Sequence, residues 1–332
     1  MPQYLILITP AANRVFAGQA AGLTATELEI CAGTDRAAVS GVQSLAGVDY
    51  VGFETSDFAA IARSVAGLSS AYALFEQVGE LLRPVELVNS DRFSDDLVTI
   101  PKYQGKTNEQ FTRMLVNVTA ASMSRSPTGP ITLLDPLAGR GTTLSVGLTL
   151  GYDVAGVESE VKAVEAYAAF LKTYLRRKRL KHKAGIDPVR REGRSLGRRL
   201  QVEVTPEAGG RPQQLTVFTG DTRQSAALFG KRRFDLVVAD APYGVVHGSS
   251  APGRRDRSPA ALLADALPVW AGQLKPGGAL GISWNTYGLT REELAAIATT
   301  AGLEPLDDGP YLRLGHRVDS AIYRDVFIAR RS

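Results

Sequence analysis

The sequence of 332 residues is poor in cysteine, with Cys31 as its single thiol. One cysteine cannot build an intrachain disulfide framework, which favours a protein of the reducing cytoplasm. Cys31 lies in an apolar segment at residues 28–32, where a thiol is more often a small core side chain than a nucleophile. Residues 1–10 lack the basic start and the small-residue cleavage site of a secretory signal. We therefore expect a cytoplasmic protein.

Long apolar runs and clusters of metal-ligating residues are also missing. No window of the sequence approaches the roughly 18 apolar residues that a membrane span needs, so we expect no membrane segment. The three histidines, His182, His247 and His316, are widely separated in the chain, and Cys31 is the only thiol that could join them. This spacing does not fit a zinc site, and we expect no metal.

Two nucleotide-binding fingerprints fail on spacing. The pattern G-x-G-x-x-G would need glycine at position 144, which is occupied by Leu144, and G-x-x-x-x-G-K-[ST] occurs nowhere in the chain. Neither a dinucleotide fingerprint nor a P-loop is therefore present.

Lysine is absent from residues 1–100, which contain five arginines and twelve acidic residues and so carry a net charge of −7. This segment alternates short apolar strands with short helices, and we expect a small α+β N-terminal domain with a structural or orienting role. Its acidity argues against it alone holding a polyanion.

The positive charge is concentrated in residues 172–199, which contain twelve Lys or Arg and two acidic residues, a net charge of +10. We predict a helix over residues 161–175 that continues into the basic block 176–183 and is broken by Pro188 and Gly193. Adjacent like charges cost stability unless something neutralises them, which favours contact with a phosphate backbone over a merely solvated face. The residues predicted to make this contact are Arg176, Arg177, Lys178, Arg179, Lys181 and Lys183.

Residues 131–158 have the pattern of a strand, a glycine turn, a helix and a second strand. The apolar run 131–134 ends in Asp135, and the turn that follows contains Gly139 and Gly141, where the backbone can pass close to a ligand. The second run ends in Glu158, which could accept hydrogen bonds from ribose hydroxyls. The pattern predicts a nucleotide-binding βαβ unit.

Two later strands also end in acids. Residues 215–219 run into Gly220 and Asp221, and residues 234–239 run into Asp240. Because the carboxyl ends of parallel strands meet at one edge of an open α/β sheet, we expect Asp135, Glu158, Asp221 and Asp240 to converge there. Residues 321–329 are predicted to form the last strand, and the loop at 245–258 is a candidate lid.

The connector ahead of this unit contains Lys106, Thr107 and Asn108. Thr107 and Gln110 have capping-box spacing, so we expect Thr107 to cap a helix that begins near Phe111. A lysine beside free backbone N–H groups would seat an anion, such as the carboxylate of an amino-acid-like cofactor. An ordinary cap beside a surface lysine is the alternative.

Taken in order, Gly-Lys-Thr-Asn, Asp-Pro-x-x-Gly-x-Gly-Thr-Thr, Gly-Asp, Asp-Ala-Pro-Tyr-Gly and Leu-Lys-Pro-Gly-Gly resemble an S-adenosylmethionine-dependent amino-methyltransferase. Within that group the chain is most similar to the tRNA guanosine-10 N2-methyltransferases, over roughly residues 100–330. The resemblance implies a Rossmann-like methyltransferase domain at 101–332, with a mostly parallel central sheet, an antiparallel last strand and a basic insertion at about 172–212. The α+β domain would occupy residues 1–100, as a reduced form of the THUMP domain that often precedes the catalytic domain in this family.

The resemblance also implies site residues and a reaction. The S-adenosyl-L-methionine site would be formed by Lys106, Thr107, Asn108, Asp135, Pro136, Gly139, Gly141, Thr142, Glu158, Asp221 and Thr222. The catalytic motif would be Asp240, Ala241, Pro242 and Tyr243, with Asp240 and the Ala241 carbonyl accepting the N–H groups of a purine amine and Tyr243 stacking on the base. Ala241 stands where the family usually has proline, and we expect a looser backbone there.

The implied substrate is RNA, with guanine N2 of tRNA favoured. Ribosomal RNA guanine N2 and DNA N6-adenine or N4-cytosine methylation are alternatives, because similar motifs serve all of these amines. Glutamine N5-methylation is less favoured, since that group prefers Asn at position 240. A non-enzymatic RNA-binding protein on an inactive methyltransferase fold is the remaining alternative.

Overall fold

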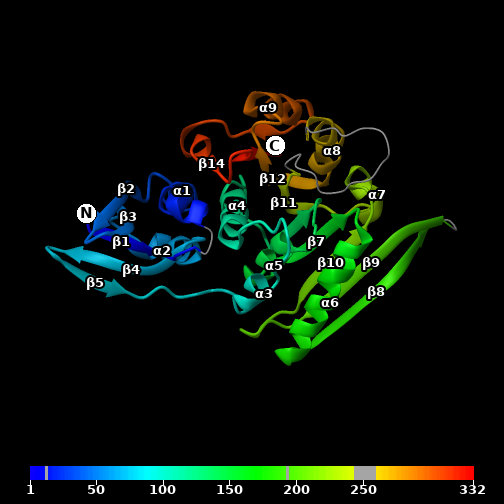
Figure 1. Ribbon diagram of the computed structural model, residues 1–332, viewed down its shortest axis with the longest axis horizontal. Helices are drawn as coiled ribbons and strands as arrows, with labels where there is room; N and C mark the ends of the chain where they lie inside the picture. The colour runs from blue at the N-terminus through cyan, green and yellow to red at the C-terminus, as the bar shows by residue number, and fades with distance from the viewer. Residues whose placement is uncertain (12–13, 192–193, 243–258) are drawn as a thin grey trace.

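A computed structural model describes residues 1–11, 14–191, 194–242 and 259–332. The described chain forms two β-sheets that lie side by side (Figure 1). In that part of the chain, no helix combines the length and the apolar character that would let it cross a bilayer.

The first sheet belongs to the N-terminal α+β domain. It contains five antiparallel strands in the order β2-β3-β1-β4-β5, and α1 and α2 pack on one face. Its elements are β1 (Gln3–Ile8), α1 (Arg14–Ala32), β2 (Ala38–Leu45), β3 (Val48–Glu54), α2 (Phe58–Gly67), β4 (Ala71–Val78) and β5 (Leu81–Val85). Strand β2 was not predicted, because this exposed edge strand is rich in glycine and serine rather than alternating apolar residues.

Two short elements connect the sheets: α3 (Asp96–Thr99) and α4 (Glu109–Ala121). Helix α4 packs against the second sheet and also holds the first domain. The Asn117 amide donates to the buried Glu27 carboxylate of α1 at 2.7 Å, and the Arg113 guanidinium makes two 2.8 Å bonds to Asp91. These contacts fix the N-terminal domain against the helix that precedes the nucleotide-binding unit.

The second sheet confirms the predicted fold class. Its strands run in the order β13-β15-β12-β11-β6-β7-β10-β9-β8, with β14 paired to β15; β10, β7, β6, β11 and β12 are parallel and β15 is antiparallel to β12. The elements of this half are β6 (Thr132–Asp135), α5 (Thr142–Thr149), β7 (Asp153–Glu158), α6 (Val161–Arg177), β8 (His182–Arg191), β9 (Arg194–Val204), β10 (Gln213–Thr219), η1 (Thr222–Gln224), α7 (Ser225–Phe229), β11 (Phe234–Asp240), α8 (Ala260–Gln273), β12 (Leu274–Asn285), α9 (Arg291–Thr300), β13 (Glu304–Pro305), η2 (Gly309–Leu312), β14 (His316–Arg317) and β15 (Tyr323–Arg330).

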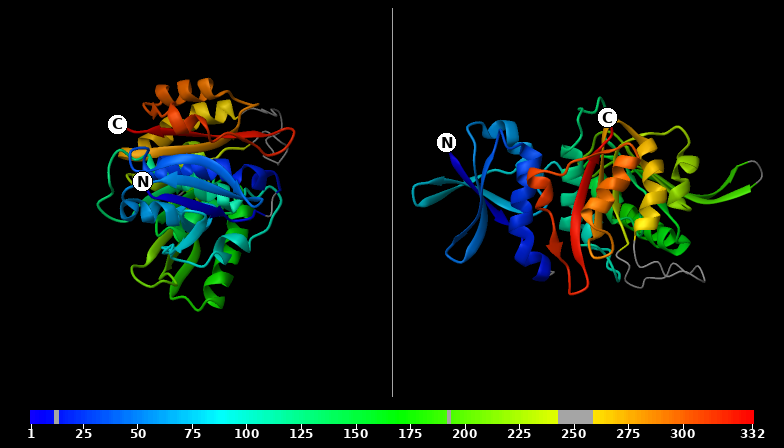
Figure 2. Two further views of the ribbon diagram at one scale, coloured as in Figure 1. Left: turned by 90° about the vertical axis from the view of Figure 1, so that its left-hand side faces the viewer. Right: turned by 90° about the horizontal axis from the view of Figure 1, so that it is seen from above.

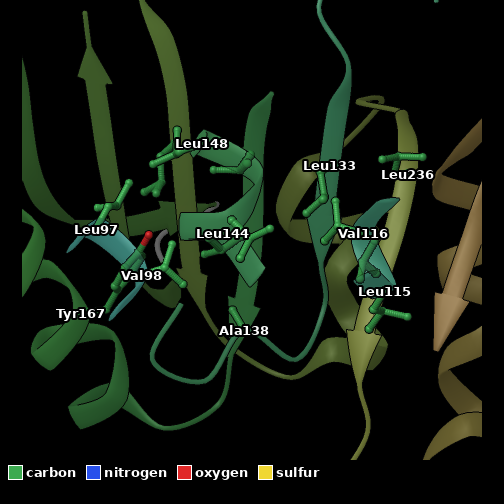
Figure 3. Packing of buried hydrophobic residues seen from close by; sticks show 14 of the residues in the cluster. Leu97, Val98, Leu115, Val116, Leu133, Ala138, Leu144, Leu148, Tyr167 and Leu236 are labelled. Carbon is green, nitrogen blue, oxygen red and sulfur yellow. The ribbon is translucent and has the colours of Figure 1, made fainter. Parts of the chain in front are cut away.

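Helices cover both faces of this sheet. Successive residues of a strand point to opposite faces, so Leu133 packs with α4, α5 and α6, whereas Leu134 packs with α8 and α9. Figure 3 shows the first of these two cores, with Leu144 and Leu148 of α5 facing Leu133. Burial on both faces explains why the parallel strands have continuous apolar sequences.

The basic segment folds differently from the prediction. Helix α6 ends at Arg177, and residues 182–191 and 194–204 pair as the antiparallel strands β8 and β9, which extend the sheet beyond β10. The sequence does carry the signal, because Leu200, Val202 and Val204 are buried at every second position of β9. The prediction of a helix through Lys183 was wrong, because the burial of every second residue, and not the density of positive charge, determines the local structure.

Candidate functional site

Three of the four strand-end acids lie at the ends of strands paired in parallel. Glu158 is aligned with Thr219, the last residue of β10, and Asp135 is aligned with Gly156 of β7. Asp240 ends β11 on the other side of β6, and Asp221 follows β10 by two residues. The structure therefore brings the four predicted acids to one edge of the sheet.

The glycine turn between β6 and α5 needs both of its glycines. Gly139 has φ +50° and Gly141 has φ +80°, in the left-handed region that side chains rarely adopt. A Cβ atom on Gly141 would lie 2.5 Å from the ring of Tyr167, whereas a Cβ on Gly139 would meet no described atom within 4 Å. Gly141 is thus fixed by packing, and the space beside Gly139 is open towards the site.

The Glu158 carboxylate braces this turn. One oxygen accepts the N–H of Gly139 at 2.8 Å, and the other accepts the N–H of Glu160 at 2.7 Å. The end of β7 is thereby tied to the turn after β6. The oxygen bonded to Glu160 also accepts from the Ser159 hydroxyl at 3.3 Å, so it is the oxygen bonded to Gly139 that keeps acceptor capacity for a further donor.

Asp135 is the most deeply buried of the four acids, with 2% of its surface exposed. It accepts the N–H of Leu137 at 3.0 Å across the turn that Pro136 begins. The pKa of Asp135 is raised to about 7, chiefly by burial and in smaller part by the charges of Asp240 and Glu158, which outweigh the lowering effect of the hydrogen bonds from Leu137 and Thr143. A cation at this edge would therefore be bound most favourably with Asp135 ionised.

Asp240 is held by two hydroxyl groups from distant segments. Thr107 donates to one carboxylate oxygen, and Ser283 of β12 donates to the other. The prediction that Thr107 caps α4 was wrong: the N-cap is Asn108, whose side chain accepts the N–H of Phe111 at 3.0 Å. The connector before α4 thus reaches the end of β11.

The ammonium group of Lys106 is occupied by protein acceptors. It donates to the carbonyl of Val98 at 2.6 Å and lies 3.5 Å from the Glu109 carboxylate. These contacts favour a structural role for Lys106 beside the helix cap over a role in binding an anion.

Ala241 does not loosen the backbone of its motif, contrary to expectation. Its N–H donates to the carbonyl of Ser283 at 2.8 Å, continuing the contact between β11 and β12. Proline has no N–H and could not make this bond. Pro242 is exposed, while Tyr243 and the predicted lid at 245–258 lie outside the described residues.

Asp221 and Thr222 are engaged at the start of η1. Asp221 accepts from the backbone of Arg223 and forms an ion pair with its guanidinium at 2.7 Å, which lowers the pKa of Asp221. Thr222 is buried and accepts the indole N–H of Trp270 at 3.0 Å. Thr222 therefore has a packing role, and Asp221 stands at the edge with its carboxylate turned to Arg223.

Four side chains near the site were not predicted from the sequence. Tyr103 shares a 2.7 Å hydrogen bond with Thr142 at the start of α5, and the Arg140 guanidinium lies 5.0 Å from the centre of its ring. Ser283 holds Asp240, and His316 is buried so that its pKa is lowered to about 4, with the Asp240 charge acting in the opposite direction. A polar residue inside the apolar run 279–284 was the only available signal for Ser283.

The predicted RNA-binding residues lie near the amino ends of the parallel strands, away from the carboxyl ends that carry the acids. His182 is aligned with Val204, and Val204 with Gln213, the first residue of β10. Of this set, Lys178 makes a 2.8 Å ion pair with Asp96; the side chains with exposed positions are Arg176, Arg177, Arg179, Lys181 and Lys183. Among the residues the structure describes, no group of three or more His, Cys, Asp or Glu side chains could hold a metal ion.

Comparisons with known proteins give similarity in fold. No protein-family model and no curated protein matches the chain. Among solved structures, the rRNA methyltransferase aviRa from Streptomyces viridochromogenes is 15% identical, over 73% of this chain and 92% of that protein, with a TM-score of 0.42. Magnesium protoporphyrin IX methyltransferase from Synechocystis, solved with bound S-adenosylmethionine, is 14% identical over 69% and 87%, with a TM-score of 0.41. The fibrillarin pre-rRNA processing protein of Methanococcus jannaschii is 13% identical over 78% and 93%, with a TM-score of 0.39.

The Ala241 hydrogen bond gives a stability prediction. Ala241→Pro removes the N–H donor to the Ser283 carbonyl in a buried part of the sheet, and we expect a loss of about 1–3 kcal/mol in the free energy of unfolding. Ala241→Gly keeps the N–H and serves as the control for the lost methyl group. Denaturant unfolding of the three proteins measures the difference, and equal stability of the proline and glycine variants would contradict this account.

Proposed function

We propose that this chain is an S-adenosylmethionine-dependent methyltransferase that modifies RNA, with guanine N2 of tRNA as the favoured target. The observation that carries the proposal is the presence, at one sheet edge, of the open glycine turn braced by Glu158 and the Asp240 carboxylate held by two hydroxyls. The first feature suits a nucleoside-containing cofactor. The second suits an acceptor for an amine N–H.

The residues fit such a cofactor in the chemistry of their donors and acceptors. The buried Asp135 carboxylate would accept the ammonium of the methionine moiety, and the open side of Gly139 leaves room for the chain beside it. Glu158 would use its remaining acceptor capacity for the ribose hydroxyls, and Asp221 would meet the adenine. When bound, the cofactor supplies an electrophilic methyl group on a sulfonium.

The protein's part in the reaction is to orient a weak nucleophile. The lone pair of a purine amine is delocalised into the ring, so the amine must be drawn towards tetrahedral geometry as its new N–C bond forms. Asp240 and the carbonyl of Ala241 would each accept one N–H, and Asp240 would take the proton that the methylated nitrogen releases. Tyr243 is proposed to stack on the base after it leaves the RNA helix.

Cofactor affinity should depend on pH through Asp135. Because its pKa is raised to about 7, the ionised carboxylate becomes scarce as the pH falls, and affinity for S-adenosylhomocysteine should drop about tenfold per unit below that pH. Asp135→Asn should weaken binding by about 1–3 kcal/mol and abolish this dependence. Isothermal titration between about pH 5.5 and 7.5 measures both effects. No binding by the wild type at any pH would refute the cofactor assignment.

The Thr107 hydroxyl should matter for turnover rather than for cofactor binding. Thr107→Val removes the donor to Asp240, and we expect kcat for tRNA methylation to fall about 10- to 100-fold, with recovery in Thr107→Ser. Thr112→Val is the matched control, because the Thr112 hydroxyl donates to the carbonyl of Asn108 within the same helix. A loss of S-adenosylhomocysteine affinity in Thr107→Val, with kcat unchanged, would instead assign Thr107 to the cofactor.

The substrate can be identified by mass spectrometry of nucleosides from cells with and without the gene. Loss of N2-methylguanosine from purified tRNA is the expected result. Its loss from ribosomal RNA would move the target to the ribosome, and loss of N6-methyladenine or N4-methylcytosine from DNA would move it to DNA. Unchanged nucleosides would favour a non-catalytic RNA-binding protein.

A further inference from the structure

The β8–β9 hairpin extends past the carboxyl end of its neighbour β10. The pairing of β9 with β10 ends at Arg199 and Phe218, and the N–H of Arg198 then donates to the Thr219 hydroxyl at 2.7 Å. Residues of β9 that precede Arg198 therefore lie beyond the last residue of β10, at the edge of the sheet that carries the acids. Figures 1 and 2 show the hairpin projecting from the body of the protein.

A glycine marks the point where the hairpin leaves the sheet. Gly197 has φ +110°, and a Cβ atom there would lie 2.4 Å from the carbonyl oxygen of Thr219. Glycine alone allows this close crossing. The pairing within the hairpin continues past it, from Pro188 with Arg198 to Arg191 with Arg194, with a register shift after Val189.

We define the hairpin arm as residues 188–191 and 194–198. It contains four arginines, Arg190, Arg191, Arg194 and Arg198, and the sequence has one acid, Glu192, between its two parts. Arg198 forms an ion pair with Glu165 of α6, and the other three arginines occupy the backbone positions of the arm that are furthest from β10. At roughly 3.3 Å per residue, the arm carries them more than about 10 Å beyond β10.

The arm lies past the carboxyl end of β10, whereas the basic end of α6 lies near the amino end of β10. Helix α6 starts after Glu158 at the acid-bearing edge and runs its 17 residues back to the other edge, a length of about 25 Å. The residues from Arg176 to Lys183 therefore lie far from Asp240, whereas the arm lies on the same side as Asp240. Across the sheet, β10, β7 and β6 separate β9 from the Asp240 strand β11, about 19 Å at roughly 4.8 Å per strand, so the arm can reach phosphates that lie on the active-site side at about that distance from the reacting base.

We propose that the hairpin arm binds the phosphate backbone of the RNA substrate next to the active site. This inference rests on the proposed function for the identity of the polyanion. Arginine forks bind phosphate oxygens in pairs, and the phosphates would offset the mutual repulsion of the arginines. Residues 1–100, with a net charge of −7, form the part of the molecule at the opposite end from the hairpin (Figure 1).

The test compares two charge-matched variants. The arm variant combines Arg190→Gln, Arg191→Gln and Arg194→Gln, and the helix-end variant combines Arg176→Gln, Arg177→Gln and Arg179→Gln. Binding of an unmodified tRNA transcript is measured by fluorescence anisotropy between about 50 and 200 mM salt. We expect the arm variant to lose about 10- to 100-fold in affinity and its salt slope to flatten by about 2–3, at 0.7–0.9 per lost phosphate contact. The helix-end variant should lose less on both measures.

Further measurements separate this inference from the proposed function. Thermal unfolding and affinity for S-adenosylhomocysteine should be unchanged in the arm variant, because glutamine leaves the backbone pairing of the hairpin intact and none of the three positions belongs to the glycine turn. If the arm variant loses tRNA affinity but the wild type transfers no methyl group to any RNA, the inference about the arm is supported and the proposed reaction is not. An equal or greater loss of tRNA affinity in the helix-end variant would contradict the proposed role of the arm. Wild-type tRNA affinity in the arm variant would contradict it as well.

Discussion

The parallel alignment of β6, β7, β10 and β11 is the constraint on which the candidate site depends. It delivers four carboxylates to one edge, and such a cluster is unfavourable unless donors or cations compensate it. The protein compensates part of the charge with its own backbone and hydroxyl groups, at Glu158 and Asp240. Asp135 is the most deeply buried of the four, and this burial is the main cause of its raised pKa. The edge is therefore prepared for a ligand that carries positive charge.

The N-terminal domain meets the second half of the protein through α4 and through α1, whose Glu29 pairs with Arg313 and whose Gln19 bonds the backbone of Arg317. Helix α4 is anchored to the first domain by Asn117 and Arg113, and the residues just before it include Thr107, which holds Asp240. A displacement of the N-terminal domain would pull on the same connector that orients the Asp240 carboxylate. The domain can thus affect the site without contacting a substrate.

The sequence predicted the parts of the fold that depend on local pattern. The apolar strands, the glycine turn and the strand-end acids followed from burial on both sheet faces and from the conformations that glycine permits. The hairpin β8–β9 was missed although Leu200, Val202 and Val204 alternate with polar residues, because the dense positive charge before them favoured an exposed helix. Thr107 and Ser283 could not be placed, since their partner Asp240 is 133 and 43 residues away in the sequence. The bond from Ala241 was also hidden, because a backbone donor has no signature in the side-chain sequence.

Three of the outer strands of the two sheets contain a proline, which affects how other strands can pair with them. Pro188 lies in β8 and Pro305 in β13, the two ends of the large sheet, and Pro84 lies in β5 at one end of the small sheet. Proline offers no N–H to an incoming strand, and β13 is only two residues long. The fourth edge, β2, is interrupted by an irregularity between Val39 and Gly41. Within the described part of the chain, a strand that paired with β5, β8 or β13 would therefore lose a hydrogen bond at Pro84, Pro188 or Pro305, which disfavours edge-to-edge association at these strands.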